Sequence, residues 1–311
     1  MKVLVTGGGG FIGSNLVRAL VERGDAVRVL DNFSTGIRAN LADLLDDVEI
    51  VEGELRSYER VHAATRGVEV VFHQGALPSV PRSVQDPLTT SAVNVEGTLN
   101  VLLAARDEGI RRVVFASSSS VYGNSNELPR VETQNPDPIS PYGVSKLAAE
   151  RYCVSFARVY PLETVALRYF NVFGPNQDPT SQYAAVVPLF VTAIAEERPV
   201  SVFGDGEQKR DFTFVTNIVE ANLVAASAHG VSGRVLNVAT GRGTSVNELA
   251  DTIGALLGKE VEREFHAERA GDVRDSWADV RRADELLGWR PRIDLEEGLR
   301  IVADAFLERV A

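Results

Sequence analysis

Three glycines near the N-terminus constrain the fold of this 311-residue chain more than any other feature. Gly7, Gly10 and Gly13 have G-x-x-G-x-x-G spacing and lie between a β-branched apolar run, Lys2–Thr6, and a helix predicted over residues 13–23. Glycines in that place allow a tight turn and close approach of the backbone to a pyrophosphate, which the helix N-terminus attracts. A flexible loop is the alternative. The context favours a dinucleotide-binding turn formed by Gly7, Gly10, Phe11, Ile12 and Gly13.

The residue after the second predicted strand indicates which dinucleotide binds. That strand covers residues 26–30 and is followed by Asp31, about 20 residues beyond the glycines, where this fold places an acidic side chain. A carboxylate there accepts hydrogen bonds from ribose hydroxyls and repels a 2′-phosphate. We therefore predict NAD rather than NADP. Alternatively, Asp31 only begins the turn in DNFSTG.

Short apolar runs alternate with helical patterns through the first half of the chain, as in βαβ units. We expect an α/β fold with a doubly wound parallel sheet of the Rossmann type. Helices are predicted at residues 92–106 and 141–156, the second with Ser140 as N-cap and Pro141 at its first position. Six sheet strands are predicted, at residues 2–6, 26–30, 48–51, 68–73, 112–116 and 163–168.

After about Phe170 the elements become shorter and are separated by Gly, Pro and polar loops. We expect a nucleotide-binding domain over residues 1–170 and a smaller α/β substrate lobe over residues 171–311, partly interleaved with it. The cleft between them is the expected site. The predicted elements of this lobe are helices at residues 187–196, 218–226, 246–257, 281–286 and 295–310, and strands at 200–202 and 235–238.

Composition excludes several classes of function. With 32 basic and 43 acidic side chains, the formal net charge is −11, which argues against nucleic acid as a partner. The single cysteine, Cys153, excludes an internal disulfide, and no Cys or His spacing indicates a metal site. The longest charge-free apolar stretch, residues 180–195, contains Pro188 and is shorter than the roughly 20 residues of a membrane helix. With no signal peptide, we expect a soluble cytoplasmic protein.

Tyr142 and Lys146 are four residues apart on a predicted helix, so their side chains share one face. A phenol has an ordinary pKa of about 10, and a neighbouring ammonium favours its ionised form, which makes a usable general base. Residues 117–120 are serines that follow a strand at the carboxyl edge, where such sheets bind ligands. In most unrelated proteins a Y-x-x-x-K pair is exposed on a helix surface and has no catalytic role. For at least two of the four serines, the alternative is that they only form a polar loop.

TGGGGFIGS, the serine run with VYG, the Y-x-x-x-K pair and ALRYFNVFGP together resemble the extended short-chain dehydrogenase/reductase family, specifically its nucleotide-sugar 4-epimerases of the UDP-galactose 4-epimerase type. The resemblance covers essentially the whole chain. It implies NAD as cofactor, a UDP-sugar as substrate, and Ser118, Tyr142 and Lys146 as the catalytic set. It places Asp31, Asn32 and Leu55 near the adenosine half of the cofactor. Around the rest it places Gln74, Gly75, Ala76, Asn94, Tyr142, Lys146 and Tyr169.

The same resemblance assigns a substrate site to the second half. It implies that Ser276 lies beside the C2 substituent, where a small residue admits an N-acetyl group, so UDP-GlcNAc and UDP-GalNAc are expected substrates with UDP-glucose and UDP-galactose. A salt bridge from Arg210 to Asp211, a plain loop role for Asp272 and a helix-cap role for Ser276 are the alternatives. The resemblance also implies that Asn171 donates to the diphosphate and that Arg210 and Arg269 neutralise it. The implied substrate contacts are Ser118, Ser119, Ser120, Asn171, Val187, Phe203, Arg210, Arg269, Asp272 and Ser276.

Departures from relatives narrow the expected reaction. Ser119 and Ser120 stand where relatives that eliminate water carry an Asp-Glu pair, and Ser120 stands where decarboxylating relatives carry a glutamate. The resemblance therefore implies 4-epimerisation of a UDP-hexose through a 4-keto intermediate. UDP-glucuronate 4-epimerisation, which needs a partner for the C6 carboxylate near residues 180–183, and a non-catalytic NAD-binding protein are the alternatives. A homodimer formed by helices 92–106 and 141–156 is a family-level expectation.

Overall fold

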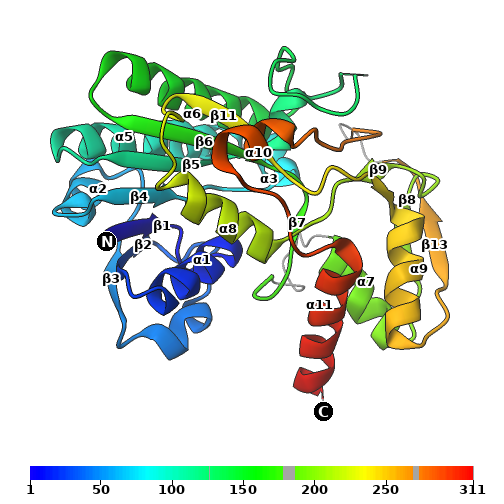
Figure 1. Cartoon of the computed structure of the whole chain (residues 1–311). Helices are drawn as coiled ribbons and strands as arrows, with labels where there is room; N and C mark the ends of the chain where they lie inside the picture. The colour runs from blue at the N-terminus through cyan, green and yellow to red at the C-terminus, as the bar shows by residue number, and fades with distance from the viewer. Residues whose placement is uncertain (126, 178–185, 269–272, 311) are drawn as a thin grey trace.

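Seven parallel strands form the central sheet of the computed structural model, which describes residues 1–125, 127–177, 186–268 and 273–310 (Figure 1). The doubly wound α/β architecture is confirmed. The expectation of six strands is wrong, because β11, from the second half of the chain, pairs with β6 at the edge. In sheet order the strands are β11 (Arg234–Val238), β6 (Glu163–Tyr169), β5 (Arg112–Ser118), β4 (Val70–His73), β1 (Lys2–Thr6), β2 (Ala26–Asp31) and β3 (Val48–Glu52).

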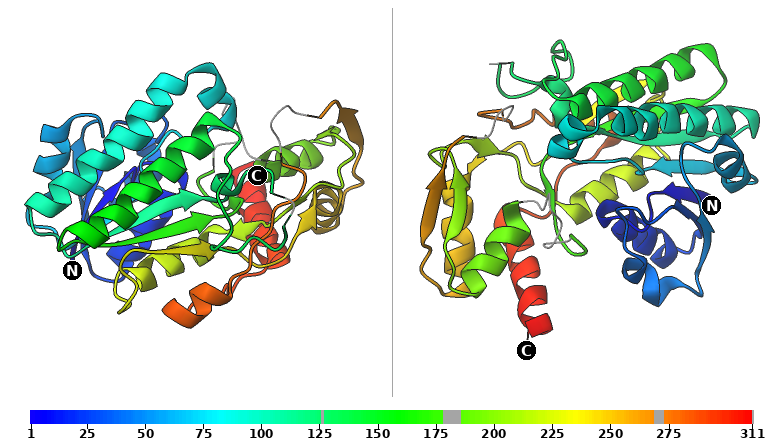
Figure 2. Two further views of the ribbon diagram at one scale, coloured as in Figure 1. Left: turned by 90° about the horizontal axis from the view of Figure 1, so that it is seen from above. Right: turned by 180° about the vertical axis from the view of Figure 1, so that it is seen from behind.

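Both faces of the sheet are covered by helices, so the side chains of each strand are buried on alternate sides. In β1, Val3 and Val5 pack in one core and Leu4 in the other. The first core lies under α1 (Phe11–Glu22) and α8 (Val215–Ala225). The opposite face carries α2 (Tyr58–Thr65), α5 (Gly97–Asp107) and α6 (Pro141–Val159), with α5 and α6 side by side (Figure 2).

The helix expected over residues 92–106 begins earlier and is not uniform. It starts with α4 (Pro87–Ser91), where the side chain of Asp86 accepts a hydrogen bond from Thr89 N at 3.0 Å. A π-helical turn, η2 (Ala92–Glu96), follows and leads directly into α5. Short helices missed by the sequence analysis also form, at η1 (Arg38–Leu44), α3 (Val80–Gln85) and η3 (Ser119–Tyr122).

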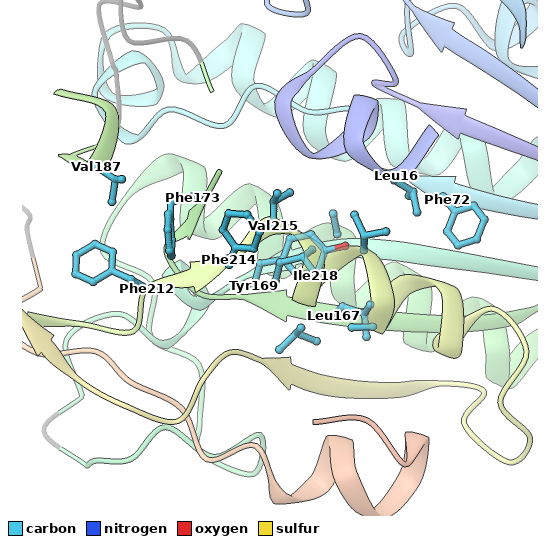
Figure 3. Close-up of a cluster of buried hydrophobic side chains, with 14 of the residues drawn as sticks. Leu16, Phe72, Leu167, Tyr169, Phe173, Val187, Phe212, Phe214, Val215 and Ile218 are labelled. Carbon is cyan, nitrogen blue, oxygen red and sulfur yellow. The ribbon is translucent and has the colours of Figure 1, made fainter. Parts of the chain in front are cut away.

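The second half of the chain builds a smaller lobe beside the sheet (Figure 1). Its core is continuous with the core of the sheet, as the path from Val187 through Phe173 and Phe214 to Ile218 and Leu167 shows (Figure 3). Because α8 and β11 return to the sheet, the two halves interleave. The lobe elements are β7 (Val172–Phe173), α7 (Val186–Ala195), β8 (Val200–Phe203), β9 (Lys209–Arg210), β10 (Thr213–Phe214), β12 (Thr244–Ser245), α9 (Val246–Leu257), β13 (Arg263–His266), α10 (Arg281–Leu287) and α11 (Leu295–Val310).

Candidate active site

A cavity of about 550 Å³ lies at the carboxyl ends of the sheet strands. Open α/β sheets bind ligands at this edge, and the volume falls within the range of small-molecule sites. Segments that follow β1, β2, β4, β5 and β6 all contribute to its wall. The predicted residues that line it are Gly7, Gly10, Phe11, Ile12, Gly13, Asp31, Asn32, Leu55, Gln74, Gly75, Ala76, Ser118, Ser119, Ser120, Tyr142, Lys146, Tyr169 and Asn171.

The glycine turn leaves no room for side chains. Gly7 has φ +71°, and a Cβ there would lie 2.6 Å from the Cα of Gly75. A Cβ at Gly13 would lie only 2.0 Å from the carbonyl oxygen of Gly7. The N-cap of α1 is Gly10, and no side chain caps this helix or places an acidic group in its first turn. Its amides and dipole therefore face the cavity in a form that suits a pyrophosphate.

Asp31 ties the end of β2 to the glycine turn. One carboxylate oxygen accepts from Gly9 N and the other from Phe33 N, both at 2.8 Å. The bond to Phe33 confirms the turn role, and each oxygen keeps lone pairs for a ribose hydroxyl. Contact with the ribose stays a prediction. The Arg38 guanidinium lies 4.0 Å from the centroid of the Phe33 ring and covers the outside of this turn.

Tyr142 and Lys146 lie on the first two turns of α6, whose start at Ser140 is as predicted: the Ser140 Oγ accepts from Gly143 N at 3.1 Å. Both side chains are buried and reach the cavity beside Ser118. The Nζ of Lys146 donates to the carbonyl oxygen of Ala116 at 2.7 Å. Helix α6 thus brings the phenol and the amine to the end of β5.

Burial dominates the electrostatics of this pair. Burial raises the pKa of Tyr142, and a hydrogen bond with Ser118 acts against that rise. Burial also lowers the pKa of Lys146 to about 8. Desolvation is the largest cause of the pKa shift at both residues, and the expected help that the ammonium gives to the phenolate stays a prediction.

The serine run divides between two roles. Ser117 Oγ donates to the buried Glu150 at 2.7 Å, and Glu150 also receives two hydrogen bonds from Arg168. Since successive strand residues point to opposite faces, Ser118 turns the other way, toward the cavity. Its Oγ donates to Ser120 Oγ and accepts from Ser120 N, both at 3.1 Å. Ser117 thus holds the strand end, and Ser118 presents its hydroxyl.

Asn94 is absent from the described residues that line the cavity. Its amide lies behind the wall, accepting from Leu77 N at 2.8 Å and donating to the oxygens of Leu77 and Ser145 at 3.2 and 3.0 Å. The π-helical turn η2 carries it to this position. In this structure Asn94 holds the loop after β4, which carries Gln74, Gly75 and Ala76, and its implied contact with the cofactor stays a prediction.

Sequence reasoning missed several contributors to the site, among them helix α3 and Asn222. Ser79, Val80 and Arg82, on or next to α3, form part of the cavity wall. The available signal was Ser79 as N-cap followed by Pro81, since serine and then proline is typical of a helix start. Asn222, on α8, donates from Nδ2 to the Tyr169 hydroxyl at 2.8 Å, and no local pattern marks it.

The substrate residues predicted in the second half form no part of the described cavity wall, apart from Asn171. Val187 packs in the core beside Phe173 and Phe212 (Figure 3). Arg210 and Ser276 are neighbours, joined by a β-bridge. Ser276 does not cap a helix, because α10 begins at Arg281 with Val280 as N-cap. Phe203 ends β8, while Arg269 and Asp272 lie outside the described residues.

Asp211 makes hydrogen bonds with backbone groups of two other segments. Its carboxylate accepts from the amides of Thr240, Gly241 and Ala278 at 2.8 to 3.3 Å. Arg210 donates from Nη1 to the carbonyl oxygens of Lys209 and Arg274. These bonds fix the course of the backbone around Arg210 and Ser276, which the resemblance places at the substrate.

Neither a membrane helix nor a metal cluster is found in the described parts of the chain. Within residues 1–125, 127–177, 186–268 and 273–310, no helix is long and apolar enough to cross a bilayer. The same residues contain no group of three or more His, Cys, Asp or Glu side chains placed to hold a metal ion.

Comparison with known proteins places these features in context. The model of the NAD dependent epimerase/dehydratase family matches residues 3–239. A protein of Methanocaldococcus jannaschii named putative UDP-glucose 4-epimerase is 40% identical over 97% of both chains. The crystal structure of UDP-glucose 4-epimerase from Thermotoga maritima with UDP-glucose superposes with a TM-score of 0.95, 38% identity and full coverage of both chains. UDP-N-acetylglucosamine 4-epimerase from Methanobrevibacter ruminantium, in complex with UDP-N-acetylmuramic acid, gives a TM-score of 0.94 and 38% identity over 99% and 98% of the two chains.

Proposed function

This chain belongs to the NAD-dependent epimerase/dehydratase family, and from that premise we propose that it inverts C4 of a UDP-hexose through a transient 4-keto sugar. One observation carries the proposal. Ser118, Tyr142 and Lys146 lie in the wall of the same cavity that begins at the glycine turn. A dinucleotide held by that turn would reach toward the hydroxyl, phenol and amine that act on the sugar.

The residues present fit NAD. The cavity beside the glycine turn can take a pyrophosphate, whereas a Cβ on Gly7 or Gly13 would collide with neighbouring backbone. Asp31 offers a carboxylate to a ribose. Held there, NAD would supply reversible hydride transfer at C4 of the sugar, so the reaction would need no net oxidant.

The chain's own residues handle the proton. Tyr142, as phenolate, takes the proton of the sugar's 4-hydroxyl, and Ser118 steadies the 4-oxygen by a hydrogen bond. The Lys146 ammonium lies on the same helix face and favours the ionised phenol. Once the 4-keto sugar has turned its other face to the cofactor, Tyr142 returns the proton and C4 is inverted. Asn171 and Arg210, which the resemblance implies to hold the diphosphate, retain the UDP during this turn.

The proposed substrate range includes N-acetylated sugars. Ser276 is small and lies next to Arg210, the predicted diphosphate ligand. UDP-GlcNAc and UDP-GalNAc then fit as well as UDP-glucose and UDP-galactose. Ser119 and Ser120 supply no acid–base pair for eliminating water, which favours epimerisation over dehydration.

One observation favours a second candidate, UDP-glucuronate 4-epimerisation. Arg82 lines the cavity and offers a cation to a C6 carboxylate. Residues 180–183, near which the sequence analysis expects such a partner, lie outside the described residues.

We also propose that the protein forms a homodimer through the helices that flank the site. Apolar side chains are exposed on α3, α4 and α6, with Leu88 83% and Val84 65% accessible. On α6 the exposed Val144, Tyr152 and Val159 recur at intervals that keep them on one side. A second copy of this surface would cover them by forming a four-helix bundle. Light scattering that gives a monomer mass at micromolar concentration would refute this assembly.

Substrate identity is tested with UDP-glucose, UDP-GlcNAc and UDP-glucuronate in separate incubations, followed by NMR of the epimers. The proposal expects UDP-galactose from the first and UDP-GalNAc from the second. Conversion of UDP-glucuronate alone would favour the second candidate. A protein that keeps bound NAD yet converts none of the three would be a binding protein.

A further inference from the structure

The backbone of the catalytic tyrosine is held by a side chain from another helix. The first amides of an α-helix have no partner within that helix, so side chains or water must satisfy them. At the start of α6, Ser140 caps Gly143 N in the usual way. The adjacent amide, Tyr142 N, donates to Ser83 Oγ at 3.0 Å. Ser83 lies 59 residues earlier, on α3.

The Ser83 hydroxyl is fixed from both sides. Its side chain is fully buried, and its Oγ donates to the carbonyl oxygen of Val80 at 2.7 Å. The hydroxyl proton is therefore used within α3, and a lone pair remains for the Tyr142 amide. Because the bond to Val80 holds the Ser83 hydroxyl in place, the bond that it accepts ties Tyr142 N to α3 at 3.0 Å.

Helix α3 is also part of the cavity wall. Ser79, Val80 and Arg82 line the cavity, and the Ser79 side chain caps α3 by accepting from Arg82 N at 3.1 Å. Ser83 follows Arg82 directly. It therefore joins the wall that faces the sugar to the residue that carries the phenol.

The carbonyl group of Tyr142 is held as well. Its oxygen accepts from Ser145 Oγ at 2.8 Å, and Ser145 in turn accepts from Asn94 Nδ2 at 3.0 Å. Ser83 on α3 and Ser145 on α6, which Asn94 holds in turn, thus bond both polar groups of Tyr142's backbone. Of these two bonds to the backbone of Tyr142, the one from Ser83 comes from a side chain outside α6.

We propose that Ser83 is a positioning residue for the proton transfer: it sets the distance of the Tyr142 hydroxyl from the bound sugar. This inference rests on the proposed epimerase function. Without the Ser83 hydroxyl, the buried Tyr142 amide loses its acceptor, and the start of α6 shifts to find another. A displacement near 1 Å at reacting atoms lowers rates by about a hundredfold. The glycine turn and Asp31, which are expected to hold the pyrophosphate and a ribose of NAD, lie outside α3 and α6.

The test compares Ser83→Ala with Ser140→Ala, a matched control that removes the same kind of bond from the next amide of the same helix end. For Ser83→Ala we expect kcat for UDP-glucose to fall about ten- to hundredfold, with KM changed less than about threefold. Ser140→Ala should lower Tm by about as much as Ser83→Ala does. Its loss of kcat should be at least about fivefold smaller than that of Ser83→Ala. Ser83→Thr keeps the hydroxyl and should restore most of kcat.

The outcomes distinguish failure of the proposed epimerase function from failure of the positioning role of Ser83. If the wild-type protein inverts no UDP-sugar, the proposed function fails. If the wild type is active but Ser83→Ala retains its kcat, the positioning role alone is refuted. The same conclusion follows if Ser83→Ala and Ser140→Ala lose kcat equally for an equal loss of Tm, since Ser83 would then be only a helix cap.

Discussion

The two halves of the molecule present their predicted site residues very differently. In the first half, glycines, Asp31 and serines that are far apart in sequence line one cavity. In the second half, Val187 is in the core, while Arg210 and Ser276 pair with each other outside the cavity wall. Parallel strand pairing brings strand ends together, so any residue just after a strand reaches the same edge. The second lobe has two-residue strands and long loops, so the position of a residue along the chain does not predict where its side chain lies.

Removing the Tyr142 hydroxyl should have the largest effect, because it acts on the part of the first half that performs the chemistry. Tyr142→Phe should lower kcat about a thousandfold, within the range of general acid–base contributions. Calorimetry should show UDP and NAD binding within about threefold of wild type, since the phenol's ring and its surroundings are kept. If Tyr142→Phe turned over substrate at the wild-type rate, the first half of the molecule would not perform the chemistry through Tyr142.

A change at the glycine turn should damage cofactor binding rather than the fold as a whole. In Gly13→Ala the new Cβ would meet the Gly7 carbonyl at 2.0 Å, so the turn must open, and NAD affinity should fall at least about tenfold. Gly24→Ala is the control: Gly24 has φ +83° with nothing within 4 Å of a Cβ. Gly24→Ala should lower the free energy of unfolding by about 1 kcal/mol and leave the affinity for NAD unchanged. Equal NAD affinity in both variants would contradict the cofactor site.

The pH profile tests the burial of the catalytic pair. Activity needs Tyr142 without its proton and Lys146 with it. The pKa of Tyr142 is raised above its usual 10.0, and that of Lys146 is lowered to about 8. Below about pH 8 the phenolate fraction rises with pH while Lys146 stays charged, so kcat/KM should rise. Above about pH 8, the falling fraction of Lys146 ammonium offsets the rising fraction of Tyr142 phenolate, so kcat/KM should level off.

The control for this profile is Lys146→Arg. A guanidinium stays protonated over the whole range, so the break near pH 8 should disappear and kcat/KM should continue to rise. A break at the same pH in both proteins would mean that another group causes it.

The smallest predicted effect concerns the second half. Ser276→Tyr should lower kcat/KM for UDP-GlcNAc about tenfold and for UDP-glucose by less, because the added ring occupies space beside C2 of the sugar. Competition assays with both substrates measure the ratio directly. An equal loss for both would mean that Ser276 supports the lobe without contacting the sugar, which would sharpen the contrast between the halves.

Local patterns predicted elements and motifs better than they predicted tertiary placement. The bounds of β1, α9 and α11 agree with prediction, because each has a clear apolar period and end signals. The position of β11 in the sheet was missed, since pairing with β6 depends on residues far apart in sequence.

At the site, the roles that the sequence did not predict also depend on residues far apart in sequence. Asn94 and Ser83 act through partners on other helices, and the pKa values of Tyr142 and Lys146 are set chiefly by burial. None of these follows from spacing along the chain. Residue types at strand ends, in contrast, identified most of the cavity wall.

The most direct test follows the hydrogen at C4 of the sugar. The protein is incubated in ordinary water with UDP-glucose that carries deuterium at C4, and the product is examined by NMR. The account predicts UDP-galactose that retains deuterium at C4, because the hydride leaves and returns while the sugar stays bound. Exchange of that deuterium for solvent hydrogen, or release of a sugar whose C4 is not inverted, would contradict it.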